Sequence, residues 1–217
     1  MRILHVIDSL GTGGAQRLIV DMAPIQKELG HSVSVLELVE SKESYLKDAL
    51  LRFGIKTTHV SNRISVYNPL LVFKIIPYLS KYDVIHVHLF PALYWVAFAK
   101  FLSFSKTPLF YTEHCTTNRR RDKWILRIFD RFAYRRYKSI IACSDKSKET
   151  FNETYPMIRI ESIPNGINLA SFNKTETIRR DLLFEITEPC FITTMVSRFN
   201  YIDGFYHKRQ DVLIRAM

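Results

Sequence analysis

The sequence contains few cysteines and no long apolar run. Its 217 residues include three cysteines, Cys115, Cys143 and Cys190, and no C-x-x-C pair. This excludes a disulfide framework and a cysteine zinc cluster, and it suits a reducing compartment. The longest apolar stretch, residues 89–104, is interrupted by Lys100 and is too short to span a bilayer. The opening MRILHVIDSL does not read as a signal peptide, so we expect a cytoplasmic protein.

Familiar catalytic motifs are missing as well. The sequence offers no paired carboxylates, no metal-ligand spacing and no serine nucleophile elbow, so we expect no metal site. The glycine-rich segment at residues 9–17 lacks the lysine of a P-loop, and Gln16 stands where G-x-G-x-x-G needs its third glycine. A nicotinamide-dependent enzyme is therefore disfavoured, with Glu37 as the one candidate for a ribose-binding acid.

The composition is that of a globular protein with a basic segment. Hydrophobic residues make up 47% and charged residues 24%, which is wrong for disorder. The net charge of +10 favours an anionic partner: nucleic acid, a phosphorylated small molecule or an anionic membrane surface. Residues 118–138 contain nine basic residues and two acidic ones. Nucleic acid is disfavoured, because the sequence has no aromatic–basic interleaving and no recognisable reading helix.

Strands and helices alternate along most of the chain, which predicts a doubly wound, mostly parallel α/β sheet covered on both faces. Apolar runs bounded by turn residues predict the strands, and apolar residues at helical spacing predict the helices. The predicted strands are residues 3–7, 33–38, 57–60, 83–88, 109–112, 139–143 and 158–162. The predicted helices are residues 15–29, 44–53, 69–80, 91–102, 122–137 and 146–153.

The regular alternation stops near Ile167, which indicates a domain boundary. We expect residues 1–180 to form a Rossmann-like domain and residues 189–217 to begin a second one, with a strand at Cys190–Val196 and a helix at Arg209–Met217. One strand–helix unit cannot bury its own apolar face. The second domain is therefore expected to be incomplete, unless this tail packs back onto the first domain.

In doubly wound folds ligands bind beyond the carboxyl ends of the strands. The glycines of residues 11–14 leave backbone N–H groups exposed at a helix start, where they can cradle a phosphate; the alternative is a tight turn that needs φ > 0. His86 and His88 share one face of their strand. His88 lies at its carboxyl end and is the candidate site residue, whereas His86 is expected to be a core histidine. Later polar loops occupy residues 112–118, 142–145 and 163–168.

The basic segment also carries an apolar stripe. Ile125, Ile128, Phe129 and Phe132 recur at i, i+3, i+4 and i+7, with arginines around them. We expect a core-facing helix with a solvated basic face. The functional alternative is a helix that lies on anionic lipid, for which replacing residues 119–121 by glutamate would abolish vesicle binding.

Taken in order, these segments resemble the amino-terminal half of a family 4 glycosyltransferase with the GT-B fold. The similar segments are Gly13-Gly14-Ala15-Gln16-Arg17, Asp83-Val84-Ile85-His86-Val87-His88, Thr112-Glu113-His114, Ala142-Cys143-Ser144, Ile163-Pro164-Asn165-Gly166-Ile167-Asn168, Val196-Ser197-Arg198-Phe199 and Lys208-Arg209-Gln210-Asp211-Val212-Leu213-Ile214.

The resemblance implies transfer of a sugar, with retention of configuration, from a nucleotide-diphosphate donor to a glycan or lipid-linked acceptor, in cell-surface polysaccharide synthesis. It implies no metal and no other cofactor. By this resemblance His88 is catalytic, the donor-binding residues are Gly13, Gly14, Arg198 and Lys208, and the acceptor-binding residues are Gln16, His114, Thr116 and Asn118.

The sequence departs from the family pattern in ways that limit this expectation. Gln16 replaces the usual glutamate, and the sequence stops before the paired-glutamate motif of the second domain. We therefore expect the 217-residue chain alone to be inactive. The alternative is a non-catalytic module that binds a membrane or a protein partner through residues 118–138.

Overall fold

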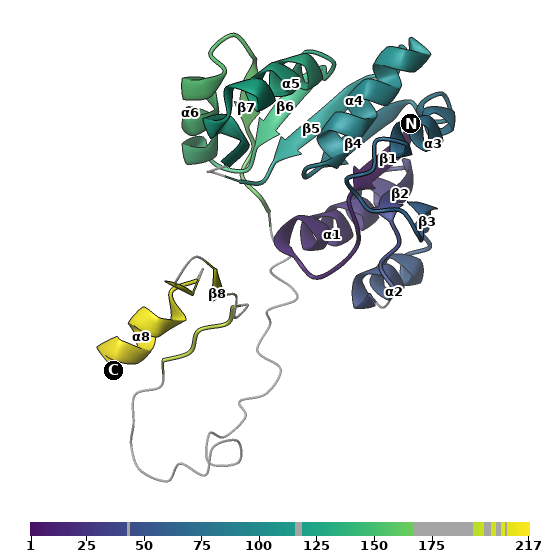
Figure 1. The fold of residues 1–217 in the computed structure, drawn as a ribbon. Coiled ribbons are helices and arrows are strands. Elements are labelled where there is room, and N and C mark those ends of the chain that lie inside the picture. The colour runs from purple at the N-terminus through teal and green to yellow at the C-terminus, as the bar shows by residue number, and fades with distance from the viewer. Residues whose placement is uncertain (43, 116–118, 167–192, 198–200, 203–204, 207) are drawn as a thin grey trace. The chain divides into compact units, whose positions relative to one another are not determined.

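The structure is a computed structural model, and it describes residues 1–42, 44–115, 119–166, 193–197, 201–202, 205–206 and 208–217 (Figure 1). The chain divides into two compact units, Met1–Leu169 and Ala170–Met217.

The first unit alternates strands and helices as predicted. Every strand and helix expected between residues 1 and 162 is present, with ends shifted by a few residues. The basic segment alone is divided, into a short 3-10 helix, η1 (Arg119–Asp122), and helix α5 (Trp124–Tyr134). The strands are β1 (Arg2–Ile7), β2 (Ser32–Val39), β3 (Lys56–Ser61), β4 (Val84–His88), β5 (Leu109–Glu113), β6 (Ser139–Ala142) and β7 (Ile160–Ser162). The other helices are α1 (Gly14–Glu28), α2 (Tyr45–Arg52), α3 (Leu71–Leu79), α4 (Ala92–Ser103) and α6 (Asp145–Thr154). Among the helices described, none is both long and apolar enough to cross a bilayer.

All seven strands are parallel and form one sheet in the order β3-β2-β1-β4-β5-β6-β7. The chain moves outward from β1 to β3 and then returns to place β4 on the other side of β1. This reversal creates a topological switch point between β1 and β4, where ligands bind in such sheets. The predicted doubly wound architecture is confirmed.

Strand alternation divides the buried side chains between the two faces of the sheet. One apolar cluster packs the sheet against α3, α4, α5 and α6, and a smaller cluster lies beneath α1 and α2 (Figure 1). In β1, Leu4 and Val6 belong to the larger cluster, whereas Ile7 belongs to the smaller one. His5 alternates with Leu4 and Val6, so it points to the α1 face.

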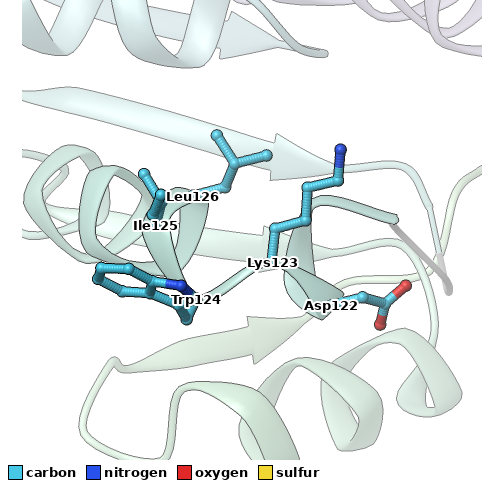
Figure 2. Close-up of a pocket in the computed structure, with 5 residues that line it drawn as sticks. All are labelled: Asp122, Lys123, Trp124, Ile125 and Leu126. Atoms are coloured by element: carbon cyan, nitrogen blue, oxygen red, sulfur yellow. The ribbon is translucent and has the colours of Figure 1, made fainter.

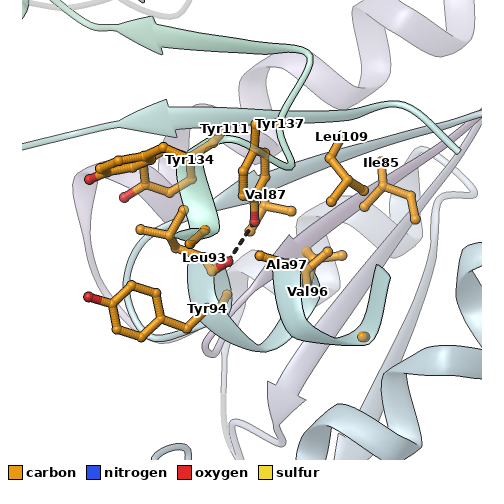
Figure 3. Close-up of a cluster of buried hydrophobic side chains, with 14 of the residues drawn as sticks. Ile85, Val87, Leu93, Tyr94, Val96, Ala97, Leu109, Tyr111, Tyr134 and Tyr137 are labelled. Atoms are coloured by element: carbon orange, nitrogen blue, oxygen red, sulfur yellow. Dashed lines mark hydrogen bonds between the residues drawn. The ribbon is translucent and has the colours of Figure 1, made fainter. Parts of the chain in front are cut away.

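Tyrosines form much of the larger cluster, and the hydroxyl groups of Tyr94 and Tyr137 bond to polar partners within it. Tyr111, Tyr134 and Tyr137 pack beside the helix α4 residues drawn in Figure 3. The Tyr137 hydroxyl donates a hydrogen bond of 2.8 Å to the carbonyl oxygen of Leu93, which fastens the end of α5 to α4. Such bonds allow large amphipathic rings to be buried without a desolvation penalty for the hydroxyl group.

A buried carboxylate joins η1 to three helices. Asp130 of α5 is fully buried, and its Oδ1 accepts from the Tyr94 hydroxyl at 2.6 Å and from Arg120 Nη1 at 3.0 Å. Its Oδ2 accepts from the Tyr155 hydroxyl at 2.6 Å. The Arg120 guanidinium also lies 4.4 Å from the centre of the Phe90 ring. These contacts fix the rotation of α5 about its own axis.

The apolar stripe of α5 does not face the core, so the expectation of a core-facing stripe is wrong for Ile125, Ile128 and Phe129. These three side chains are exposed, and the buried residues of α5 are instead Asp130, Ala133 and Tyr134. The reason is the buried Asp130 network, which turns the opposite side of the helix outward.

The second unit differs from its prediction. Thr193–Val196, the described part of the predicted strand, is not in a strand; Cys190, Phe191 and Ile192 lie outside the described residues. A parallel strand needs neighbours to bond its backbone groups, and the strands described in this unit are the short hairpin β8 (Tyr201–Ile202) and β9 (Phe205–Tyr206). The predicted helix is confirmed as α8 (Gln210–Ala216).

Replacing Arg120 by methionine should lower the free energy of unfolding by about 3–5 kcal/mol, because Asp130 would remain buried without its cation. The matched control is Arg131→Met, at an exposed position of the same segment, for which a change within about 0.5 kcal/mol is expected. Urea unfolding at neutral pH measures both values. Equal effects of the two substitutions would contradict the structural role of the Arg120–Asp130 pair.

Candidate functional site

Polar side chains gather at the carboxyl edge of β1, β4, β5 and β6, beside the switch point. The edge begins with the loop after β1, which contains the glycines of residues 11–14. It continues with the ends of β4 and β5, where His88 and His114 are hydrogen-bonded, and reaches Cys143 after β6. These loops therefore form one continuous edge, as the parallel topology requires.

The start of α1 has the chemistry to bind an anion. Gly13 is its N-cap residue, and no side chain caps this end of the helix. The backbone N–H groups of the first turn therefore have no intrahelical partner and point out of the helix. This end of the helix also carries the positive partial charge of the helix dipole. The first turn also has no acidic residue that would compete for them. This arrangement can bind a phosphate.

The glycines are not there to permit a positive φ, so that interpretation of the loop is wrong. Among described glycines, φ is positive at Gly30 and Gly54 but not in this loop. At Gly13 a Cβ atom would collide with the Gln16 side chain, whereas at Gly14 it would meet nothing within 4 Å. A side chain at position 13 would therefore displace Gln16, and the absence of a side chain at Gly14 leaves open space over the helix start.

Two buried side chains hold the glycine loop in place. Gln16, predicted to contact acceptor, donates from Nε2 to the carbonyl oxygen of Ser9 at 3.2 Å and is almost fully buried. Glu37 accepts from the Leu10 backbone N–H at 2.9 Å, and it is paired with Lys47 at 2.8 Å. Glu37 is therefore a structural brace in this chain, which removes the one candidate for a ribose-binding acid.

A row of histidines crosses the sheet on the α1 face. His5 Nε2 lies 2.8 Å from Gln26 Oε1, and His5 Nδ1 lies 3.1 Å from His88 Nε2. His88 Nδ1 is 3.2 Å from His114 Nε2, and His114 Nδ1 is 3.6 Å from Cys143 Sγ. We call these five residues the histidine chain. It runs from beneath α1 to the carboxyl edge.

If each ring is neutral, the donor and the acceptor of every hydrogen bond in the histidine chain can be assigned. Gln26 Oε1 is an acceptor, so His5 donates from Nε2 and can only accept at Nδ1. His88 then donates from Nε2 to His5, and His114 donates from Nε2 to His88. At the far end, the Cys143 thiol donates to His114 Nδ1. Each ring thus carries its proton on Nε2, and every bond has one donor and one acceptor.

Burial keeps these rings neutral. It lowers the pKa of His5 to about 4 and that of His114 to about 4. Burial, reinforced by the neighbouring histidines, also holds the pKa of His86 and His88 well below the ordinary value. Because a buried imidazolium has lost its hydration, the neutral form is preferred. At neutral pH the histidine chain therefore brings no positive charge to the site.

The predicted roles of His86 and His88 match the structure only in part. His88 is at the carboxyl end of β4, but its ring is fully buried and both ring nitrogens are bonded. His86, expected to be the more buried of the two, is only partly buried and bonds to Thr112 Oγ1 at 2.7 Å. His114 is the half-buried ring at the edge itself.

Sequence reasoning missed three residues of this site. His5 and Gln26 join the histidine chain from β1 and α1, and no local spacing links them to His88. Asp8 follows β1 directly and accepts from the Ser9 N–H at 2.7 Å, and burial raises the pKa of its carboxyl group. Its position after a strand is the same signal that singled out His88, so Asp8 could have been found.

The remaining predicted site residues lie outside the described residues or in the second unit. Thr116, Asn118 and Arg198 lie outside the described residues. Lys208 is exposed and belongs to the second unit. Ser144 caps α6 by accepting from the Ser147 N–H at 3.2 Å, so the polar loop at residues 142–145 ends in a helix cap.

The group of described residues nearest to a metal-ligand arrangement is His5, His86 and His88, whose ligand atoms lie within 4.8 Å of one another. The spacing of these residues in the sequence gave no sign of this cluster. Both ring nitrogens of His5 and His88 are already hydrogen-bonded. A metal ion would have to displace the central hydrogen bond of the histidine chain, between His5 and His88.

The family model for Glycosyltransferase Family 4 matches residues 12–171. This range begins in the glycine loop and includes every later strand and helix of the first unit. A search of curated proteins gave no match.

Solved glycosyltransferase structures have a similar fold. Anabaena Alr3699/HepE in complex with UDP-glucose has 24% identity and a TM-score of 0.62, over 78% of this chain and 45% of that one. A glycosyltransferase from Rickettsia africae has 19% identity and a TM-score of 0.56, over 84% of this chain and 47% of that one. The lipopolysaccharide outer core galactosyltransferase WaaB has 15% identity and a TM-score of 0.55, over 78% and 47%. The chain therefore spans less than half the length of these proteins, and the likeness is one of fold.

The buried neutral histidines should make stability fall in acid. Their folded pKa lies below the unfolded value of about 6.5, so the unfolded chain binds protons first as the pH falls. Their contribution to the free energy of unfolding is fully present above about pH 6.5, and it is lost as the pH falls from there to about pH 4. Each such histidine should add a slope approaching about 1.4 kcal/mol per pH unit to the free energy of unfolding below pH 6.5.

Urea unfolding at a series of pH values measures this slope, and His5→Gln should reduce it by the share of one histidine. Asn152→Gln, which exchanges two neutral side chains at an exposed position of α6, is the control and should leave the slope unchanged. A free energy of unfolding that stays constant from neutral pH to about pH 5 would contradict the neutral chain.

Proposed function

Because the chain belongs to glycosyltransferase family 4, we propose that it forms the acceptor-side half of a retaining glycosyltransferase. The reaction is transfer of a sugar from a nucleotide-diphosphate donor to a glycan or lipid-linked acceptor. The observation that carries the proposal is the uncapped start of α1 beside the histidine chain, inside the range that the family model matches. The fold alone would leave the reaction open.

The donor diphosphate is proposed to lie over Gly13 and Gly14. There it would accept hydrogen bonds from the first-turn N–H groups of α1 and meet the positive end of the helix. The open space over Gly14 supports a close approach. That the similar Anabaena protein was crystallised with UDP and with UDP-glucose supports a nucleotide-sugar donor here. Arg198 and Lys208 remain proposed phosphate partners from the second unit.

The electrostatics of the edge suit this reaction. Negative charge develops on the departing diphosphate, and a fixed positive partial charge at the α1 start stabilises it without reorganisation. Positive charge develops on the sugar, and the neutral histidines do not oppose it. We propose that His114 is the ring nearest the reacting sugar and that His88 acts through it as a positioning residue, since His88 is buried behind it. No step here requires a metal ion.

The acceptor is proposed to be a glycan or lipid-linked sugar used in cell-surface polysaccharide synthesis, and the place of action the cytoplasmic side of an anionic membrane. His114, Gln16, Thr116 and Asn118 are the proposed acceptor contacts. Since Gln16 already braces the glycine loop, its contact would use the Oε1 atom rather than the bonded Nε2. The alternative function is a non-catalytic module that binds a membrane or protein partner.

Transfer of labelled sugar from a panel of nucleotide sugars to lipid and glycan extracts tests the function. The 217-residue chain alone should transfer no sugar, because it covers less than half of each of the solved structures that it resembles. The mass of the protein as its cells produce it decides which form to assay next. Transfer by a longer native form would support the proposal. Failure of every native form to transfer sugar would favour the non-catalytic module, and robust transfer by the 217-residue chain would overturn the expected inactivity.

Gly14→Ala should weaken donor binding without loss of stability. The added methyl group meets no protein atom within 4 Å, and alanine is the better residue within a helix, but the methyl group would occupy the space proposed for the diphosphate. Titration of the chain with millimolar UDP, followed by the backbone amide NMR signals of residues 13–17, should show shifts that become at least about fivefold weaker in the variant.

Gly11→Ala is the matched control, because its Cβ atom would make only an ordinary contact with the Ser9 side chain. It should bind UDP like the unmodified chain. Signals of residues 13–17 that do not respond to UDP at all would remove the helix start from the donor site.

A further inference from the structure

Helix α5 turns an apolar surface away from the core. Trp124 is 71% exposed, Ile125 50%, Ile128 55% and Phe129 45%. Four large apolar side chains in one short helix exceed what scattered surface residues account for. The apolar side of α5 must face outward, because Asp130, Ala133 and Tyr134 are buried on the other side of the helix.

The apolar surface continues onto the end of α4. Phe132 of α5 stacks on Phe98 at 4.9 Å and meets Phe101 edge-on at 5.4 Å between ring centres. Phe101 is itself exposed, and so is Phe104 just beyond α4. The two helices thus present one surface, which we call the α4–α5 surface: Phe101, Phe104, Trp124, Ile125, Ile128 and Phe129.

Basic side chains lie beside this surface. Lys123, Arg127, Arg131 and Arg135 are exposed and follow one another at four-residue spacing, so they lie along one side of α5. Lys138 is also exposed, and the exposed acidic residue of the segment is Asp122.

The arginines at positions 120 and 121 do not belong to this exposed basic row. Arg120 is 9% exposed and paired with Asp130, and Arg121 is 5% exposed and paired with Glu113 at 3.1 Å. Substituting them would break buried ion pairs, so the glutamate substitutions of residues 119–121 considered from the sequence would test stability rather than binding.

A shallow hollow of about 520 Å³ lies at the start of α5 (Figure 2). Its lining combines the apolar Trp124, Ile125 and Leu126 with the charged Lys123 and Asp122. Tryptophan and lysine favour the boundary between lipid chains and headgroups, because each combines an apolar body with a polar tip. This end of α5 follows the loop after β5, so it is close in sequence to the candidate site edge.

We propose that the α4–α5 surface docks onto an anionic lipid membrane. Trp124, Ile125 and Ile128 enter the boundary between headgroups and acyl chains, while Arg131, Arg135 and their basic neighbours face the lipid phosphates. An apolar surface flanked by cations matches a membrane, in which apolar acyl chains lie beneath anionic headgroups. A nucleic acid would leave the apolar side chains in water. The inference deepens the proposed function, because it would bring a lipid-linked acceptor to the edge where His114 lies, but docking itself requires no sugar transfer.

Flotation of the 217-residue chain with vesicles tests the proposal. Vesicles of equal phosphatidylglycerol and phosphatidylcholine should bind the chain, pure phosphatidylcholine should bind it poorly, and added salt should release it. Arg131→Glu combined with Arg135→Glu should weaken binding by at least about tenfold. The matched control reverses two exposed charges elsewhere, Arg52→Glu with Lys56→Glu, and should bind almost as the unmodified chain.

Trp124 supplies a second readout. The sequence contains two tryptophans, so Trp95→Phe leaves Trp124 as the only one. Its fluorescence should shift to shorter wavelength with the anionic vesicles and be quenched by brominated acyl chains. Trp124→Ser with Ile128→Ser should bind at least about tenfold more weakly and keep the unmodified circular dichroism spectrum.

Three results would overturn the proposal: no binding to anionic vesicles, binding that the substitutions leave unchanged, or a lipid-free Trp124 shift that grows with protein concentration. The last would assign the surface to self-association. None of these measurements uses a donor or acceptor, so failure here is distinguishable from failure of the UDP titration.

Discussion

The buried ion pair between Arg120 and Asp130 is the constraint on which much of the molecule depends. A carboxylate removed from water must be met by charge and hydrogen bonds, and here one guanidinium and two tyrosine hydroxyls meet it. Because these donors come from η1, α4 and α6, the pair fixes four segments together. It also determines which side of α5 remains exposed. The same interaction that secures the larger apolar cluster therefore creates the α4–α5 surface.

The opposite face of the sheet buries neutral histidines rather than an ion pair. Its central strands carry histidines where a parallel sheet usually carries apolar residues, and each ring finds a partner in the next. A row of neutral imidazoles satisfies its own hydrogen bonds without any buried charge. The row ends at His114, near the switch point between β1 and β4. The hydrogen bonds that allow the histidines to be buried therefore also orient the His114 ring at the edge of the site.

The helix starts and the strand ends meet at the same edge of the sheet, and this brings three features together. The start of α1 supplies partial positive charge, the histidine chain supplies neutral rings, and the start of α5 carries Trp124 and Lys123. In a parallel α/β sheet this convergence is automatic, because every strand ends where the next helix begins. The proposed donor site and the proposed membrane surface thus arise from one topology rather than from separate insertions.

Local sequence patterns predicted the parallel α/β architecture, the position of almost every element in the first unit and the loops of the candidate site. These predictions depend on local periodicity and on glycine and polar residues next to apolar runs, such as Gly13 and His88. The exposure of individual side chains depends instead on tertiary contacts. The pairing of Arg120 with Asp130 spans ten residues and that of His5 with His88 spans eighty-three, and no periodic pattern records such contacts. Helical spacing likewise marked Ile125 and Ile128 as one stripe without saying whether that stripe faces the core. The contacts of Asp130 settled this, because they hold the side of α5 that carries Asp130, Ala133 and Tyr134 against the core.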